Sequence, residues 1–382
     1  MLFAGTQSEG VFRSTDDGAT WAAANTGMDT YVAALATTGT NTSSPMLFAG
    51  TSVGVFLSPD NGLSWAAVNN GMGTTNVYAL AVRDTNVSAP KLFAATNSGV
   101  FLSSDNGLSW SPVNSGMGGI DVFALAVIGT NLFAGTSIGV FLSTNNGTTW
   151  HPVNFGIANT VVLAFAVISA NTSSPTLFAG TLHEGVYLSS NNGASWVNVR
   201  TGLINPNITA LAVKAPDSSS PTLFAGTFDA VGEPGGVFLS TDKGTSWAAI
   251  NIGLTNKDTR SLAISVPYLF AGTNGSGVWR RPLSELSIVS PNELSMTFGL
   301  DQNYPNPFNP STEISFTLSE RSMVQLDVFD MLGRKLQTLV HGEMEAGLHS
   351  MRFDAVHLAR GIYTACLTAN GGRREMKMVL GR

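Results

Sequence analysis

The sequence predicts an all-β protein with two domains, a seven-bladed β-propeller followed by a small β-sandwich. Three observations predict this fold. A short apolar segment recurs every 40–46 residues over most of the chain, 41 of the 382 residues are glycine, and charged residues make up only 12% of the total. Frequent glycine-bearing turns between short stretches rich in Val, Phe and Leu are typical of strands rather than helices.

The recurring unit contains four short strand-like segments. The most regular of them reads Leu-Phe-Ala-Gly-Thr, or a close variant, and begins at Leu2, Leu47, Leu92, Leu132, Leu177, Leu223 and Leu269. A Gly-Val-Phe-Leu-Ser type segment, a polar turn that ends in tryptophan, a short strand and an Ala-Leu-Ala-Val type stretch follow it. Four strands in 40–46 residues are typical of one propeller blade, so seven copies predict seven blades.

The first and last blades are incomplete in this sequence. The first unit begins at the second strand, and the last has no turn and no outer strand after Arg281. The missing pieces are one outer and one inner strand, which an upstream segment would supply to close the ring and protect its sheet edges. We therefore expect Met1 to be an internal methionine of a longer natural chain, with the export signal also upstream.

The polar turn has a physical explanation in its residue types. A carboxylate or amide oxygen can accept backbone N–H bonds within the turn, glycine tolerates a positive φ, and tryptophan can pack between adjacent blades. We expect the acidic or amide residue and the tryptophan of each copy to be structural: Asp16 and Trp21, Asp60 and Trp65, Asp105 and Trp110, Asn145 and Trp150, Asn191 and Trp196, and Asp242 and Trp247.

The octamer Ser-x-Asp-x-Gly-x-(Ser/Thr)-Trp resembles the Asp-box, or BNR repeat, of sialidase-like propellers. The similarity extends over residues 2–282. A sialidase would also need an arginine triad, a Tyr–Glu pair and an acidic general acid, and the Phe/Tyr-Arg-Ile-Pro motif of sialidases is missing from the sequence. The resemblance therefore covers the repeat and implies a sialidase-like propeller fold without sialidase chemistry.

Candidate ligand-binding residues lie on one face of the predicted propeller, some of them where the repeat is broken. Propeller ligands usually bind on the face formed by the turns between second and third strands and by the connections between blades, and departures from a repeat are where a specific site is expected. The candidates on this face are His183, Glu184, Asp229, Glu233, Asp121 and Asp29. The competing explanation is solvated loop charge, since charged side chains are mostly exposed. No catalytic residue is predicted.

The C-terminal part has a different pattern. Residues 284–300 carry no repeat and predict a linker between the propeller at 1–283 and a second domain at 301–382. In the second domain, four alternating apolar and polar stretches are separated by Gly333, Gly347 and Gly361. This alternation predicts a small Ig-like β-sandwich.

The second domain closely resembles the type A sorting domain of the type IX secretion system. The string Asn-Tyr-Pro-Asn-Pro-Phe-Asn-Pro begins at Asn303, and a Met-Leu-Gly-Arg turn and a Gly-Ile-Tyr segment follow. The motif residues are Asn303, Tyr304, Pro305, Asn306, Pro307, Phe308, Gly333, Gly361 and Tyr363. The resemblance implies export to the extracellular space or the outer-membrane surface, with the type IX machinery as a partner.

Several classes of function are disfavoured. The net charge is −6 without a basic stripe, which argues against nucleic-acid binding. Cys366 is the lone cysteine and His183 has no neighbouring ligand set, so neither a metal site nor a cofactor is predicted. No apolar run is long enough for a membrane-spanning helix. Two Gly-x-Ser-x-Gly strings, at 50–54 and 135–139, are repeat turns and lack the strand-to-helix context of a nucleophile elbow.

Two functions remain open. The first is an exported binding or structural module for a glycan or a surface protein, and the short, similar, neutral loops favour it. The alternative is a secreted polysaccharide-degrading glycoside hydrolase, because some Asp-box propellers hydrolyse xyloglucan. Turnover on a polysaccharide panel, lost with Asp121→Ala or Glu233→Ala, would favour the alternative.

Overall fold

The computed structural model describes residues 1–382 except 29–30, 39–44, 84–89, 158, 169–174, 219–220, 229–234, 287–297, 301–302, 304–305, 319, 346, 370 and 382. The chain divides into two compact units, Met1–Leu286 and Ser287–Arg382. Strands dominate both units, and the described residues contain one helical element, the 3-10 turn η1 (Leu283–Leu286). The all-β prediction is confirmed.

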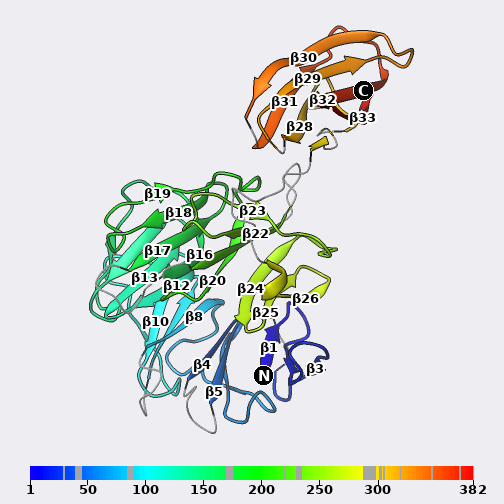
Figure 1. The fold of residues 1–382 in the computed structure, drawn as a ribbon. Helices are drawn as coiled ribbons and strands as arrows, with labels where there is room; N and C mark the ends of the chain where they lie inside the picture. Colours follow the sequence, from blue (N-terminus) through cyan, green and yellow to red (C-terminus); the bar gives the residue numbers. More distant parts are fainter. Residues whose placement is uncertain are drawn as a thin grey trace. The chain divides into compact units, whose positions relative to one another are not determined.

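The first unit is a β-propeller domain whose described residues form seven antiparallel sheets (Figure 1). The inner strands, which lie beside one another from sheet to sheet, are β4 (Val32–Thr38), β8 (Val77–Arg83), β12 (Val122–Ile128), β16 (Val162–Ile168), β20 (Ile208–Lys214) and β24 (Thr259–Ser265). The second strands are β1 (Leu2–Gly5), β5 (Met46–Thr51), β9 (Lys91–Thr96), β13 (Asn131–Thr136), β17 (Thr176–Thr181), β21 (Thr222–Thr227) and β25 (Tyr268–Thr273).

The remaining strands complete each sheet toward the outside. The third strands are β2 (Val11–Ser14), β6 (Gly54–Ser58), β10 (Gly99–Ser103), β14 (Gly139–Ser143), β18 (Gly185–Ser189), β22 (Gly236–Ser240) and β26 (Gly277–Pro282). The outer strands are β3 (Ala22–Ala23), β7 (Ala66–Ala67), β11 (Ser111–Pro112), β15 (His151–Pro152), β19 (Val197–Asn198) and β23 (Ala248–Ala249). Five sheets have four strands, and β1-β2-β3 and β24-β25-β26 have three.

The tryptophans of the repeat join neighbouring sheets. Five of them are at most 5% exposed. The indole Nε1 of each donates a hydrogen bond of 2.7–2.9 Å to a backbone carbonyl just after the outer strand of the preceding sheet. The pairs are Trp65 with Ala24, Trp110 with Val68, Trp150 with Val113, Trp196 with Val153, and Trp247 with Val199. Each joint therefore combines apolar burial with a satisfied buried donor.

The acidic residue of the repeat organises its own turn. Asp60 Oδ1 accepts the Ser64 backbone N–H at 2.9 Å, and Oδ2 accepts the Ser64 hydroxyl at 2.6 Å. Asn145 makes the corresponding bonds: its Oδ1 accepts the Thr149 N–H at 2.9 Å, and its Nδ2 donates to Thr149 Oγ1 at 2.9 Å. An amide can replace the carboxylate because the partner hydroxyl can either donate or accept.

These turns predict an acid-dependent loss of stability. Hydrogen bonds from the Ser64 side chain, and then from its backbone, lower the pKa of Asp60 from 3.8 to about 2. A carboxyl group whose pKa is lower in the folded than in the unfolded state stabilises the fold at pH values above the unfolded-state pKa. This stabilisation is lost as the pH falls through the folded-state pKa. We expect stability to fall between about pH 4 and pH 2, and Asp60→Asn to remove part of that fall.

NMR titration of side-chain carboxyl carbons would test this expectation. The Asp60 resonance should titrate near pH 2, while the backbone amides of the Asn145 and Asn191 turns, which carry no titrating group at that position, serve as the internal control. A midpoint at the ordinary value of 3.8 would contradict the proposed hydrogen bonding.

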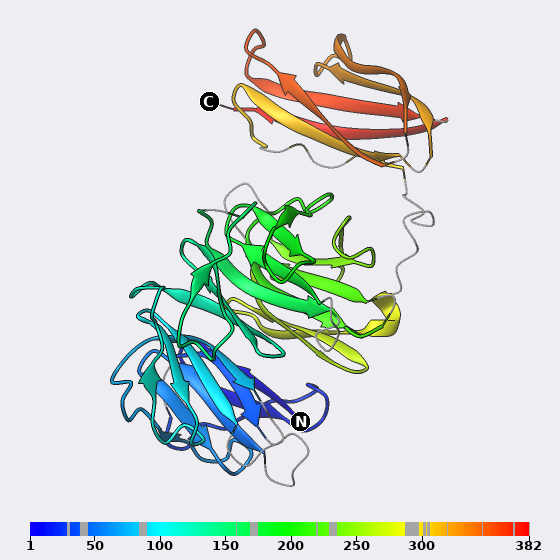
Figure 2. The ribbon, with the colours of Figure 1, turned by 90° about the vertical axis from the view of Figure 1, so that its left-hand side faces the viewer.

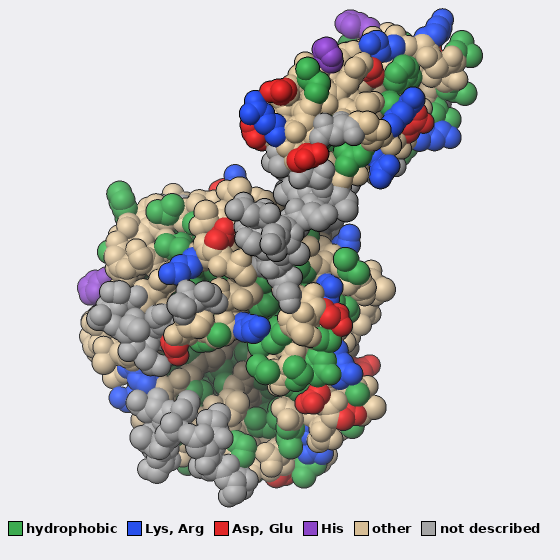
Figure 3. All heavy atoms as spheres, viewed as in Figure 1, with side chains coloured by type: hydrophobic (Ala, Val, Ile, Leu, Met, Phe, Trp, Pro, Cys, Tyr) green, Lys and Arg blue, Asp and Glu red, His purple; other side chains and the backbone are tan. Residues whose placement is uncertain are grey.

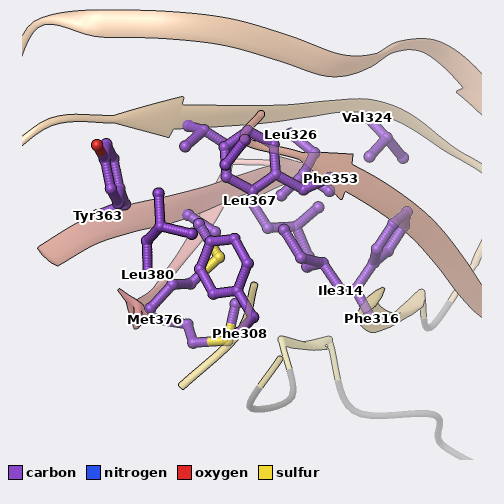
Figure 4. Close-up of a cluster of buried hydrophobic side chains, with 14 of the residues drawn as sticks. Phe308, Ile314, Phe316, Val324, Leu326, Phe353, Tyr363, Leu367, Met376 and Leu380 are labelled. Atoms are coloured by element: carbon purple, nitrogen blue, oxygen red, sulfur yellow. The ribbon is translucent and has the colours of Figure 1, made fainter. Parts of the chain in front are cut away.

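The second unit consists of two antiparallel sheets around one core. The first sheet has the order β27 (Gly299–Leu300), β28 (Ser311–Leu318) and β31 (Gly347–Asp354). The second has the order β30 (Lys335–Met344), β29 (Ser322–Phe329), β32 (Gly361–Ala369) and β33 (Gly372–Leu380). Figure 2 shows its long strands running side by side, and Figure 4 shows side chains of both sheets in the shared core.

Both units extend into the predicted linker. Leu283 and Leu286 are buried, and the Leu283 N–H donates to the Pro267 carbonyl at 2.8 Å, so the first unit continues through η1. At the other end, Leu300 pairs with Phe316 in β28. Leu286 and Leu300, at the two ends of the segment predicted as a linker at 284–300, are thus part of the first and the second unit, respectively.

Candidate functional site

Each inner strand starts with a β-bulge at the same place. The pairing with the second strand skips one residue in all six cases, for example between Val122 and Ala124. A bulge re-aims the side chain of its extra residue. We call the six bulged residues the bulge ring: Ala33, Tyr78, Phe123, Leu163, Thr209 and Arg260. They lie at the end of the propeller formed by the turns between second and third strands and by the connections between sheets, here called the loop face.

One side of the bulge ring is apolar. The Tyr78 and Phe123 rings, from β8 and β12, lie 5.4 Å apart at an interplanar angle of 41°. Both side chains are only partly buried, as is Leu163 on β16. Three successive sheets thus present apolar side chains that still reach solvent. Figure 3 shows the opposite end of the propeller, where hydrophobic side chains also lie inside a central hollow.

The other side of the ring is polar and held by hydrogen bonds. Arg260 Nη2 donates to Asp258 Oδ2 at 2.9 Å, and Arg260 Nε lies 2.7 Å from Oδ1, so the guanidinium forms an ion pair with both carboxylate oxygens. Asn274 Nδ2 donates to Asp258 Oδ2 at 2.8 Å, and Asn256 Nδ2 donates to the Asn274 carbonyl at 2.6 Å. We call Asn256, Asp258, Arg260 and Asn274 the Arg260 cluster.

An aromatic ring supports the guanidinium of this cluster. The Arg260 Cζ atom lies 5.2 Å from the centroid of the Phe228 ring, within the range of a cation–π contact. The Arg260 side chain is 47% exposed, whereas that of Asp258 is 15% exposed. The cluster therefore fixes the orientation of the arginine and leaves part of its donor surface open to solvent.

The candidates predicted from sequence that the structure describes belong to two different sheets. His183 and Glu184 are exposed between β17 and β18, and His183 has a φ of +77°. Asp121 is half-buried before β12, where its carbonyl accepts the Ser137 N–H at 3.3 Å. Asp29, Asp229 and Glu233 lie outside the described residues. In the described part of the chain, no hydrogen bond or ion pair joins the side chains of Asp121, His183 and Glu184.

Sequence reasoning missed the Arg260 cluster. Neither Asp258 nor Arg260 is among the candidates predicted from the sequence. The available signal was the departure of the last inner strand from the repeat, since Arg260 occupies a position that holds Ala, Tyr, Phe, Leu or Thr in the other units. Its importance depends on the bulge, which the repeat pattern does not encode.

The sorting motif is folded against the C-terminal strand. Asn306 Oδ1 accepts the Val379 N–H at 2.8 Å, and the Phe308 N–H donates to the Val379 carbonyl at 2.9 Å. Asn303, 1% exposed, donates from Nδ2 to Thr312 Oγ1 at 2.9 Å. Tyr304 and Pro305 lie outside the described residues, and Pro307 lies between the two residues that contact β33. The motif therefore acts as an extra edge segment next to β33.

The other sorting-motif residues lie at turns and strand ends. Gly333 has a φ of +75° in a turn where Asp330 Oδ1 accepts the N–H groups of Leu332 and Arg334, both at 2.9 Å. The Arg334 backbone hydrogen bond is the main cause of a lowered Asp330 pKa. Gly361 begins β32, and the Tyr363 hydroxyl donates to the Ala359 carbonyl. These contacts give each of them a role within the fold of the second unit.

Two other features are absent from the residues that the structure describes. No three His, Cys, Asp or Glu side chains gather as metal ligands there. Likewise, none of the described helical residues forms a helix with the length and apolar character needed to cross a membrane.

The fold defines a β-propeller protein with a second, all-β C-terminal unit. Residues 46–287 match the DUF6242 beta propeller domain, and the chain belongs to this family. Residues 302–380 match the secretion system C-terminal sorting domain, which marks the chain for the type IX pathway to the cell surface or beyond. No curated protein matches the chain.

Solved structures with a similar fold include enzymes of family GH74. A GH74 xyloglucanase from Xanthomonas campestris is 15% identical, with a TM-score of 0.55 over 98% of this chain and 65% of that one. An ancestral GH74 enzyme is 17% identical, with a TM-score of 0.58 over 97% and 57%. The Niastella koreensis GH74 enzyme is 16% identical, with a TM-score of 0.53 over 98% and 64%. The chain thus spans less than two thirds of their length, and the likeness concerns the fold.

Proposed function

We propose that this protein is an exported, seven-bladed Asp-box propeller that binds a glycan on its loop face, with an Ig-like C-terminal domain that directs its secretion. The observation that carries the proposal is the bulge ring, which combines an aromatic pair on one side with the Arg260 cluster on the other. Ligand sites in proteins are mostly apolar with a few fixed polar groups. A sugar offers both a C–H face for stacking and hydroxyls for charged donors.

The polar side of the site supports binding more than catalysis. Asp258 is engaged by Arg260 and Asn274, so its carboxylate is committed to orienting the arginine. Glycosidases of the usual kind use two facing carboxylates, one of which stays available as a general acid. Within the described residues, no second carboxylate is bonded into the Arg260 cluster. We therefore propose a binding protein, with no catalytic residue among those described.

Binding to a glycan panel tests the proposed site. Because the aromatic pair would supply the stacking surface, we expect Tyr78→Ala or Phe123→Ala to weaken binding about tenfold, equivalent to about 1.4 kcal/mol. Isothermal titration or a glycan array would measure it. Leu108→Ala is a matched control, because this exposed leucine lies in a repeat turn next to Asp105, at the opposite end of the propeller. Equal losses in all three variants, or capture of a protein in place of any glycan, would contradict the proposal.

A second prediction concerns the arginine. Arg260→Lys keeps the charge but loses the planar fork that pairs with Asp258, and lysine does not replace arginine at bidentate sites. We expect this variant to bind the same glycan about tenfold more weakly while its unfolding temperature stays close to that of the wild type. Turnover of any polysaccharide by the wild-type chain, lost in Asp121→Ala, would instead favour the glycoside hydrolase alternative.

A further inference from the structure

The two three-stranded sheets, β24-β25-β26 and β1-β2-β3, lie side by side although they come from opposite ends of the first unit (Figure 1). A Cβ added to Gly18 would lie 2.8 Å from the Phe270 ring, and Arg280 donates to the Asp17 carbonyl. The turn glycines of other joints meet the phenylalanine of the preceding sheet in the same way, as Gly62 meets Phe3. This joint, here called the seam, is therefore built on the same plan as the others.

The seam nevertheless lacks contacts that the other joints make. Trp21 occupies the position of the five buried tryptophans, but it is only partly buried, and in the described part of the chain its indole has no carbonyl partner. The backbone N–H groups of the other five also donate to the preceding sheet, as Trp150 does to Ser115 at 2.8 Å. The carbonyls that would accept these two hydrogen bonds from Trp21 belong to the end of an outer strand paired with β26. The described residues do not supply that strand.

An asparagine is also missing at the seam. In five sheets, the second residue after the outer strand is an asparagine. Its Oδ1 accepts the N–H of the valine in the third strand at 2.5–2.7 Å. The pairs are Asn25 with Val11, Asn69 with Val55, Asn114 with Val100, Asn154 with Val140, and Asn251 with Val237. The glycine before that valine packs on the asparagine, whereas nothing lies within 4 Å of a Cβ added to Gly277.

The inner side of the seam is open as well. The glycine of most second strands packs on the first residue of the next inner strand: Gly5 on Val32, Gly50 on Val77, Gly135 on Val162, Gly180 on Ile208 and Gly226 on Thr259. At the corresponding Gly272, the neighbour within 4 Å is Ser261 of its own sheet. The edge of β1 that would pair with an inner strand is also unpaired within the described residues.

We infer that the seam is a binding site for one polypeptide segment with the repeat's own pattern, an outer strand, a connection and an inner strand, which the described residues do not supply. Its outer strand adds to β26 and supplies the asparagine for Val278 and the carbonyls for Trp21. Its inner strand adds to β1 and places a β-branched residue on Gly272. Strand addition of this kind uses main-chain hydrogen bonds for affinity and side-chain slots for specificity.

The structure also indicates where this segment begins. Gly253 lies next to Trp279, and Arg281 Nη1 donates to the Ile250 carbonyl at 3.4 Å. In the other joints, a tryptophan from the next sheet occupies these places. The site that a turn tryptophan would fill is therefore taken by Trp279 and Arg281, and the bound segment starts at the outer strand.

A synthetic peptide with the sequence of Ser111–Ile128 is the direct probe. It contains one outer strand, Asn114 and one inner strand, and it has no tryptophan. We expect it to bind the 382-residue chain with 1:1 stoichiometry and to shift the tryptophan fluorescence to shorter wavelength, a shift that Trp21→Phe reduces. Peptides with Asn114→Leu or Val122→Asp should bind at least tenfold more weakly, and a scrambled peptide should not bind.

A fusion of the same segment to the chain tests the inference if the free peptide is poorly soluble. Residues Ser111–Asn131 are copied in place of Met1, so that the new inner strand leads into Leu2 through the tight turn that precedes Leu132. We expect the fusion to raise the melting temperature by about 5 °C or more over a scrambled extension. Failure of both the peptide and the fusion, or a dimer of the unmodified chain in which Trp21 is already buried, would overturn the inference.

Discussion

Replacing Trp150 with alanine is expected to lower the free energy of unfolding of the propeller unit by about 3–5 kcal/mol. Trp150 is 1% exposed, and its Nε1 donates to the Val113 carbonyl of the preceding sheet at 2.7 Å. Truncation removes the packing of the indole between two sheets and leaves a partly buried carbonyl without its donor. Urea denaturation followed by circular dichroism measures the loss.

Trp21→Ala is the matched control because it removes the same side chain from the same slot of the repeat. Trp21 is only partly buried and makes no indole hydrogen bond to a neighbouring sheet in the described residues. We expect a loss of about 1 kcal/mol, typical of an average substitution. Similar losses in the two variants would mean that the contacts across the joints do not determine the stability of the propeller.

The repeat made most of the propeller unit predictable. Each Leu-Phe-Ala-Gly-Thr segment became a second strand, and the Gly-Val-Phe-Leu-Ser segment paired with it in the register that the turn between them dictates, as Thr51 pairs with Gly54. Pairings this close in sequence depend on local turn chemistry. Seven copies of one pattern also average out the ambiguity that a single short strand would leave.

The candidate site was less predictable because it depends on contacts between distant residues. Arg260 pairs with Asp258, two positions away in the sequence. The other contacts of this pair come from distant residues: the Phe228 ring, after β21, lies against the guanidinium, and Asn274, after β25, donates to the Asp258 carboxylate. The sequence drew attention to acidic residues in irregular loops instead. An irregular loop shows where the repeat is broken, but it does not show which side chains the fold brings together.

The sorting motif illustrates the same limit in the second unit. Its residue string is specific enough to predict the domain, yet the partner of Asn306 is Val379, 73 residues further along the chain. Nothing in the spacing of the motif predicts that contact. The alternation of apolar residues did predict the strands, since Ile314, Phe316 and Leu318 all face the core.

Replacing Phe308 with alanine should destabilise the sorting unit by about 3–5 kcal/mol and reduce export more than tenfold. Phe308 is 1% exposed, and its ring lies 5.9 Å from that of Phe353 in the core of the unit (Figure 4). Its backbone hydrogen bond to Val379 survives the substitution, so the loss measures side-chain packing. Quantifying the protein in the medium, at the cell surface and inside the cell measures export.

Measuring the unfolding of each unit distinguishes a general loss of folding from a loss of recognition by the secretion machinery. Phe308→Ala should leave the unfolding transition of the propeller unit unchanged, because Phe308 packs within the second unit. Met331→Ala is the control, since this side chain is 73% exposed and contributes little to the core. If Phe308→Ala is exported at the wild-type level although its sorting unit is unfolded, the machinery reads the motif as a linear signal. If export fails with the fold, the machinery requires the motif in its position beside β33.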